Sequence, residues 1–157
     1  MKLVLASDHA GLKLKAAVLA RLEKRGLPVV DFGTYDETSV DYPDFARMVA
    51  GSVTRGESDR GILVCGSGVG MSIVANKFPG VRAALVDSVA TARQSRAHVD
   101  ANVLVFGQNN LPEDVALEAL EVWLDTPFEG GRHARRLAKI AAVEKEIADE
   151  VKSGGSR

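Results

Sequence analysis

The sequence contains a single cysteine, Cys65, among 157 residues. One cysteine permits no internal disulfide and no cysteine cage around a metal ion, and it is typical of a protein of the reducing cytoplasm. The sequence also lacks an apolar run of about 18 residues, which a membrane-spanning helix needs, and the apolar stretch after Met1 is too short for a signal-peptide core. These absences predict a cytoplasmic protein that folds without a disulfide or a metal.

Charge of either sign is not in excess. The chain has 20 Lys and Arg against 21 Asp and Glu, for a net charge of −1. Proteins that bind nucleic acid or a membrane surface usually carry a basic excess, so neither is expected as a partner. The length suits one domain, and no repeat or linker divides it. We predict a single domain over residues 1–151 and a disordered, Ser- and Gly-rich tail over 152–157.

Short apolar segments alternate with longer segments of helical spacing. The short ones are Lys2–Ala6, Pro28–Phe32, Gly61–Cys65, Arg82–Val86 and Asn102–Phe106. Near-continuous apolar runs of this kind suit strands that are covered on both faces, as in a parallel sheet. The alternation predicts an α/β fold, a doubly wound five-stranded parallel sheet with right-handed crossovers.

A longer helix is expected after the last strand, over Arg132–Val151. Leu137, Ile140, Ile147 and Val151 lie along one stripe of it. Such a helix could pack on its own sheet or cross to a second subunit, and the spacing favours neither interpretation.

Ligands of a parallel α/β sheet bind at the carboxyl ends of its strands. Asp8 and His9 follow the first predicted strand, Cys65 ends the third, and the helix after the fourth ends near His98. We therefore expect His9 and His98 near this edge.

Cys65 begins the run Cys-Gly-Ser-Gly-Val-Gly. Glycines let backbone N–H groups approach an anion closely, and a helix beginning near Val69 would lower the pKa of the thiol. Most lone cysteines are small buried apolar residues, but the glycine loop favours a functional one.

The Cys65 loop fits three other kinds of glycine-rich site poorly. A dinucleotide fingerprint belongs after the first strand, and Asp31 alone is a weak sign of a ribose-binding acid. A cysteine phosphatase would need an arginine where Met71 stands, and a P-loop would need Gly-Lys-Ser/Thr. A thiol, oxyanion-binding N–H groups and a histidine instead suit aldose–ketose isomerisation, which requires a base, oxyanion donors and an acid, and in principle neither metal nor cofactor.

Arg132 and Arg136 lie four residues apart, hence on one helix face, where paired arginines suit a phosphate dianion. A solvated basic face is the commoner explanation of such spacing, and Arg135 nearby supports it.

Motifs throughout the chain resemble the ribose-5-phosphate isomerase type B family, which also includes galactose-6-phosphate isomerase subunits. They are Ser-Asp-His-Ala-Gly at 7–11, Asp-Tyr-Pro at 41–43, Cys-Gly-Ser-Gly-Val-Gly at 65–70, Asn76-Lys77, Arg82-Ala83-Ala84, Ser95-Arg96 with His98, Asn102-Val103-Leu104 and Thr-Pro-Phe-Glu-Gly-Gly-Arg-His at 126–133. The resemblance runs from about residue 2 to residue 145, with the motifs in the family's order.

The resemblance implies a Rossmann-like fold and a homodimer, or a dimer of dimers, with shared active sites and a phosphorylated sugar as substrate, ribose 5-phosphate first. It makes Cys65 the base. The enediolate oxygen would be bound by Ser67 and by the backbone of Gly66, Gly68 and Gly70. The resemblance makes His98, helped by Asp8, the group that opens the sugar ring. It assigns phosphate binding to His9, Arg132 and Arg136, and the two arginines would come from the partner subunit. It places Tyr42 in the sugar site and His133 near the phosphate.

Two positions depart from the family pattern. Val99 stands where an asparagine is usual, and Gln108 lies where an arginine often aids phosphate binding. Both would lie near the substrate, so a tetrose phosphate or another aldose phosphate is an alternative substrate. A flavodoxin-like module that binds a sugar phosphate or nucleotide without turnover is a further alternative, and a redox protein would lack a second cysteine.

Overall fold

The computed structural model describes residues 1–154 and contains a five-stranded, wholly parallel sheet of order β2-β1-β3-β5-β4. The strands are β1 (Leu3–Ser7), β2 (Val29–Asp31), β3 (Arg60–Cys65), β4 (Ala83–Val86) and β5 (Val103–Gly107). Each lies within one residue of its predicted bounds at either end, so the predicted fold class is confirmed. No helix of the described part is long and apolar enough to span a membrane.

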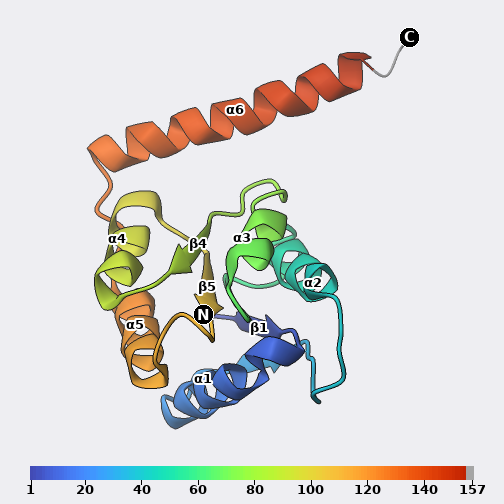
Figure 1. Cartoon of the computed structure of the whole chain (residues 1–157). Coiled ribbons are helices and arrows are strands. Elements are labelled where there is room, and N and C mark those ends of the chain that lie inside the picture. The colour runs from blue at the N-terminus through green and yellow to red at the C-terminus, as the bar shows by residue number, and fades with distance from the viewer. Residues whose placement is uncertain (155–157) are drawn as a thin grey trace.

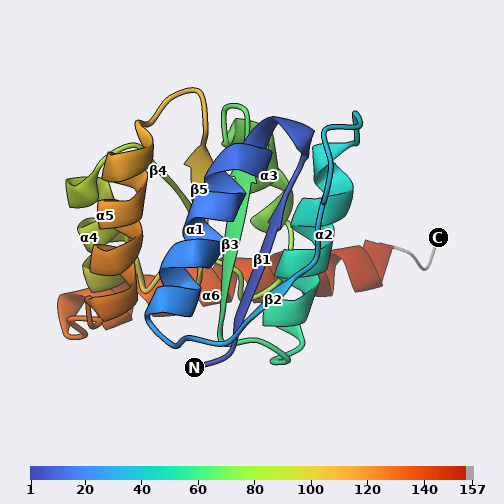
Figure 2. The same cartoon turned by 90° about the horizontal axis from the view of Figure 1, so that it is seen from below.

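Helices cover both faces of the sheet (Figures 1 and 2). They are the 3-10 turn η1 (His9–Gly11), α1 (Leu12–Lys24), α2 (Tyr42–Thr54), α3 (Val69–Ala75), α4 (Val89–Val99), α5 (Glu113–Asp125) and α6 (Arg132–Gly154). Side chains of α1, α4 and α5 pack with one set of strand residues, and those of α2 and α3 pack with the other set. The result is a three-layer sandwich with two apolar cores.

The alternation of side chains along β3 decides where the thiol lies. Ile62 and Val64 belong to the core beneath α1 and α5, whereas Leu63 and Cys65 belong to the core beneath α2 and α3. Successive strand residues point to opposite faces, so Cys65 lies at the carboxyl end of β3 on the α2–α3 side.

Glycine allows the chain after β3 to touch the end of β5. A Cβ atom added at Gly107 would lie 2.5 Å from the carbonyl oxygen of Ser67, which is backbone and has little room to move. Gly68, at the start of α3, has a φ of 79°, in the left-handed region that favours glycine. These two glycines hold the 66–70 loop against the sheet.

Helix α6 leaves the body of the molecule instead of lying on its own sheet. It passes the β4 edge and projects beyond the other helices (Figures 1 and 2). A cavity of about 420 Å³ separates it from β4, and Ile140, Val143, Ile147 and Val151 are 47–72% exposed. The helix also continues to Gly154, so residues 152–154 of the predicted disordered tail are helical, and 155–157 lie outside the described residues.

We predict that Gly107→Ala lowers the free energy of unfolding by about 1–3 kcal/mol, because the added methyl group overpacks rigid backbone. Urea unfolding would measure the change. Gly51→Ala in α2 is the matched control: its Cβ meets only the flexible end of Arg55, at 2.9 Å, and alanine is favoured over glycine inside a helix. Equal effects of the two substitutions would contradict the importance of the close approach.

Candidate active site

One group of predicted site residues gathers at the carboxyl edge of the sheet. Asp8 and His9 follow β1, Cys65 ends β3, and Tyr42 begins α2. The N–H of Asp8 donates to the carbonyl of Val64 over 3.3 Å, which brings the end of β1 beside the end of β3. The structure therefore brings together the thiol, a carboxyl group and an imidazole.

The Cys65 sulfur is buried and accepts a hydrogen bond from the N–H of Gly68 over 3.0 Å. Burial raises the pKa of the Cys65 thiol above its ordinary value, and the negative charge of Asp8 adds to the rise. The backbone N–H groups of Gly68, Ser67 and Met71 act in the opposite direction but do not outweigh burial. The expected lowering of this pKa is thus wrong for the isolated chain, because desolvation exceeds the effect of the short helix α3.

Asp8 is itself nearly buried. Its carboxylate accepts a hydrogen bond from the N–H of Gly11 over 3.0 Å, which caps the η1 turn. Burial raises the pKa of Asp8, and the bond from Gly11 together with the charge of His9 opposes that rise. A carboxyl group with a raised pKa is suited to exchange protons with a ligand.

His9 and Tyr42 are fixed by neighbouring backbone. The Nδ1 atom of His9 accepts a hydrogen bond from the N–H of Val40 over 3.2 Å, which leaves Nε2 to carry the proton of the neutral ring. The Tyr42 ring lies over Gly70, where an added Cβ would come within 2.5 Å of it. Tyr42 therefore borders the glycine loop, and His9 is held by the segment that precedes α2.

A second group of predicted residues lies at the opposite edge. His98 is in the last turn of α4, and β5 begins shortly afterwards at Val103, which pairs with Gly61 near the start of β3. Cys65 instead pairs with Gly107, four residues further along β5, or about 13 Å at 3.3 Å per residue. The expectation that His98 lies near the carboxyl edge is wrong, because α4 runs antiparallel to the strands and ends at their amino edge.

Arg132, His133 and Arg136 lie near His98, at the start of α6. The imidazoles of His98 and His133 are stacked, with ring centroids 4.3 Å apart and ring planes 3° from parallel. Figure 2 shows α6 beginning at the same end of the molecule as the chain's N-terminus. In one chain, the structure does not bring these residues together with Cys65.

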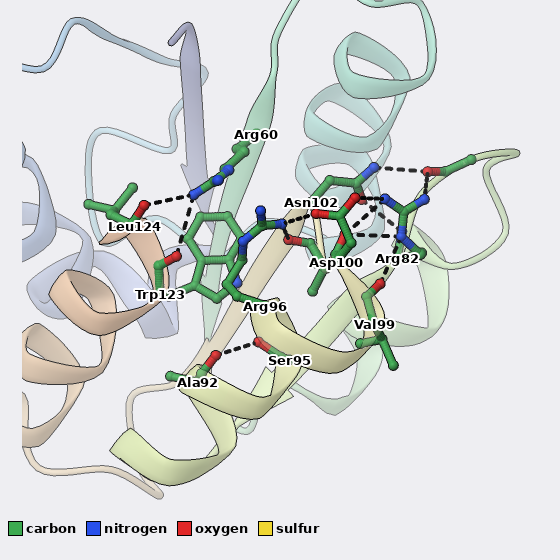
Figure 3. Close-up of polar contacts among 12 residues, drawn as sticks. Arg60, Arg82, Ala92, Ser95, Arg96, Val99, Asp100, Asn102, Trp123 and Leu124 are labelled. Atoms are coloured by element: carbon green, nitrogen blue, oxygen red, sulfur yellow. Dashed lines mark hydrogen bonds and ion pairs between the residues drawn. The ribbon is translucent and has the colours of Figure 1, made fainter. Parts of the chain in front are cut away.

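An ionic network fixes the end of α4 (Figure 3). Asp100 has a φ of 46°, in the left-handed region, and its carboxylate pairs with Arg96 at 2.7 Å and with Arg82 at 3.0 Å. Arg96 is buried and lies, like Arg60, near the ring of the buried Trp123. Arg82 and Arg96, which the family motifs include, thus hold the turn that follows His98.

One cluster in the described part of the chain has the residue types to hold a metal ion: His98, Glu129 and His133, with potential ligand atoms within 4.8 Å of one another. A metal ion lies in the plane of an imidazole that binds it, along the nitrogen lone pair. The lone pairs of two parallel stacked rings do not converge on one point. This arrangement therefore does not fit a shared metal.

A doubly wound α/β sheet with a thiol, a carboxyl group and an imidazole gathered at its carboxyl edge is an arrangement typical of an enzyme. A family model described as Ribose/Galactose Isomerase matches residues 3–140. The chain belongs to this family.

Named relatives agree with this assignment. The chain is 44% identical over 144 residues to ribose-5-phosphate isomerase B of Escherichia coli, covering 92% of this chain and 97% of the relative. A solved ribose-5-phosphate isomerase B of Clostridium thermocellum is 50% identical and superposes with a TM-score of 0.92, covering 94% of this chain and 99% of that one. The enzyme of Mycoplasma genitalium, solved with bound ribulose 5-phosphate, is 44% identical with a TM-score of 0.89, covering 92% and 97% of the two chains.

The sequence analysis assigns no role to Glu129, although the motif at 126–133 includes it. Its carboxylate Oε2 lies 3.5 Å from Nε2 of His133 and 3.9 Å from Nε2 of His98. The spacing of four residues between Glu129 and His133 was a usable signal, but their approach to His98 depends on how α4 and α6 meet.

We predict that, in the dissociated subunit, alkylation of Cys65 by iodoacetamide has a pH midpoint above that of a cysteine in a short peptide measured alongside. Asp8→Asn removes a negative charge and keeps an oxygen for the Gly11 N–H, so the midpoint should fall and alkylation at pH 7 should become severalfold faster. Asp87→Asn, at the end of β4, is the control carboxylate on the same edge. A midpoint unchanged by Asp8→Asn would contradict the coupling of the two groups.

Proposed function

We propose that the chain converts ribose 5-phosphate to ribulose 5-phosphate through an enediolate, with Cys65 as the base and without a cofactor. Family membership makes the chain an aldose–ketose isomerase, which removes a non-catalytic binding module and a redox protein from consideration. The names of the relatives and the ribulose 5-phosphate bound to one of them support this choice of sugar. A cytoplasmic location stays a prediction.

The observation that carries the proposal is the Cys65 sulfur at the carboxyl edge with a backbone N–H 3.0 Å away. As thiolate, Cys65 takes the proton from C2 of the open-chain aldose, and the C2 electrons form the enediolate with the negative charge on O1. The O2 hydroxyl proton passes to O1, and the Cys65 thiol, whose proton can exchange with solvent, delivers a proton to C1 to give the C2 ketone. The Ser67 hydroxyl and the first N–H groups of α3, which have no acceptor within the helix, are the proposed donors to the enediolate oxygen.

We further propose that each site is shared between two subunits of a homodimer, or of a dimer of dimers. Cys65, Asp8, His9 and Tyr42 would come from the carboxyl edge of one subunit. His98, Arg132, His133 and Arg136 would come from the amino edge of the other. Support comes from the separation of the two groups and from the exposed apolar stripe of α6, which one chain leaves uncovered.

Shared sites would also make the thiol a better base. Arg132 and Arg136 of the partner subunit would bind the phosphate together with the Nε2 atom of His9, and their charges would favour the thiolate of Cys65. In the isolated chain, burial leaves that thiol protonated at neutral pH. Assembly would thus supply both the phosphate site and part of the activation of the base.

A second substrate, a tetrose phosphate, is favoured by two side chains. Gln108 accepts a hydrogen bond from the N–H of Leu14 over 2.8 Å, so its side chain holds α1 and supplies no charge to a phosphate. Val99, which follows His98, is exposed and offers no amide to a sugar hydroxyl. The depth at which phosphate is held sets the preferred length of the sugar chain.

Cys65→Ala and His98→Ala should each lower kcat/KM for ribose 5-phosphate by at least about 100-fold, since each removes a proton-transfer group. Mixing the two inactive variants should restore activity after subunit exchange, because one site of a mixed dimer has both intact edges. A mixture of Cys65→Ala and Asp8→Asn is the control: both changes lie at the same edge, so no mixed site is intact. Absence of recovery in the first mixture after verified exchange would contradict shared sites.

Val99→Asn tests the choice of sugar. If the missing amide weakens pentose recognition, the substitution should raise the ratio of kcat/KM for ribose 5-phosphate over that for erythrose 4-phosphate by about five- to a hundredfold, the equivalent of about 1–3 kcal/mol. Val30→Asn, at an exposed valine of β2, is the matched control. An unchanged ratio would show that Val99 does not set specificity.

A further inference from the structure

The stack of His98 and His133 joins an exposed ring to a buried one. The His98 side chain is 41% exposed, whereas that of His133 is 7% exposed. With ring planes only 3° from parallel, one face of His98 rests on a ring that the body of the protein holds. The stack fixes the plane of His98 and leaves its edge accessible to a ligand.

Glu129 lies beside the nitrogen edge of both rings. Its Oε2 atom is 3.5 Å from Nε2 of His133 and 3.9 Å from Nε2 of His98. The N–H of Glu129 donates to the carbonyl of Ala97 over 3.0 Å, so the segment before α6 is tied to the last turn of α4. This backbone bond keeps the carboxylate next to the two imidazoles.

The charges around the stack favour a neutral His133. Burial lowers the pKa of His133, the charges of His98, Arg132 and Arg136 lower it further, and Glu129 alone opposes them. Two protonated rings 4.3 Å apart would repel each other. A neutral His133 can lie flat on His98 in either protonation state of His98, so the stack survives a cycle of proton transfer.

We propose that Glu129 and His133 are positioning residues for His98 in the opening of the sugar ring. Glu129 orients the Nε2 edge of His98, and His133 holds the plane of its ring. The inference rests on the proposed function and deepens it, and it gives His133 a role through His98 in place of the expected contact with phosphate.

Opening of the sugar ring moves one proton away from O1 and one proton to O4. The O1 hydroxyl of the cyclic sugar loses its proton to Asp8, the C1–O4 bond breaks, C1=O1 forms, and O4 takes a proton from Nε2 of His98 of the partner subunit. No atom is oxidised or reduced, and the ring becomes the open-chain aldose on which Cys65 acts. Only a sugar that can close a ring through O4 needs this step.

With ribulose 5-phosphate as substrate, enolisation can be measured without ring opening. Its C5 oxygen carries the phosphate, so the C2 ketone has no free hydroxyl with which to form a five-membered ring. Exchange of its C1 hydrogen for solvent deuterium therefore reports the thiol half of the reaction without ring opening. Isomerisation of ribose 5-phosphate reports both steps.

The experiment compares both rates for the wild type, Glu129→Gln, His133→Ala and His133→Phe. We expect Glu129→Gln and His133→Ala to lower kcat/KM for ribose 5-phosphate by about 10- to 100-fold, as a misplaced catalytic group does, while exchange into ribulose 5-phosphate stays within about threefold. His133→Phe should recover most of the His133→Ala loss, because phenylalanine restores the stack without a titratable nitrogen. Glu118→Gln, an exposed residue of α5 without a hydrogen bond or ion pair in the described part of the chain, is the control.

Three results are decisive. A fall in isomerisation with exchange retained supports the positioning role. A proportional fall in both rates, or no change in either, overturns it while leaving the isomerase assignment intact. A wild-type protein that neither isomerises ribose 5-phosphate nor exchanges the ribulose 5-phosphate hydrogen overturns the proposed function itself.

Discussion

In a sheet of parallel strands, every strand ends at one edge and every crossover helix ends at the other. The side chains that this chain offers for chemistry are divided between those two edges. Asp8 follows a strand and Cys65 ends one, whereas His98 lies in the last turn of a helix. The right-handed β–α–β connection cannot bring both sets to one place within a single copy, so the parallel sheet itself underlies the argument for shared sites.

The same constraint explains the state of the thiol. Cys65 ends a strand that is buried on both faces, and it faces the core formed with α2 and α3. Burial there favours the neutral thiol, and three backbone N–H groups offset this only in part. If Cys65 is the base, as proposed, charge brought from outside the subunit would activate it, and Arg132 and Arg136 at the start of α6 are exposed.

The sequence predicts those features of the structure that depend only on residues close together in the chain. Apolar runs located all five strands and placed Cys65 at the end of the third. Helix direction also implies the edge at which His98 lies, because a crossover helix ends at the amino edge of the strands, whereas the carboxyl-edge rule holds only for residues that follow strands. The raised pKa of Cys65 and the approach of Glu129 to His98 depend on burial and on contacts between distant segments, which local pattern does not contain.

If the sites are shared as proposed, the projecting helix α6 has an evolutionary consequence. In a chain that contributes a different set of residues to each of two sites, the two edges can diverge independently after gene duplication. One copy could lose its thiol edge and the other copy its histidine edge, and a pair of them would still assemble one complete site. The exposed stripe of α6 would then be the surface that selection must preserve longest, because it decides which copies meet.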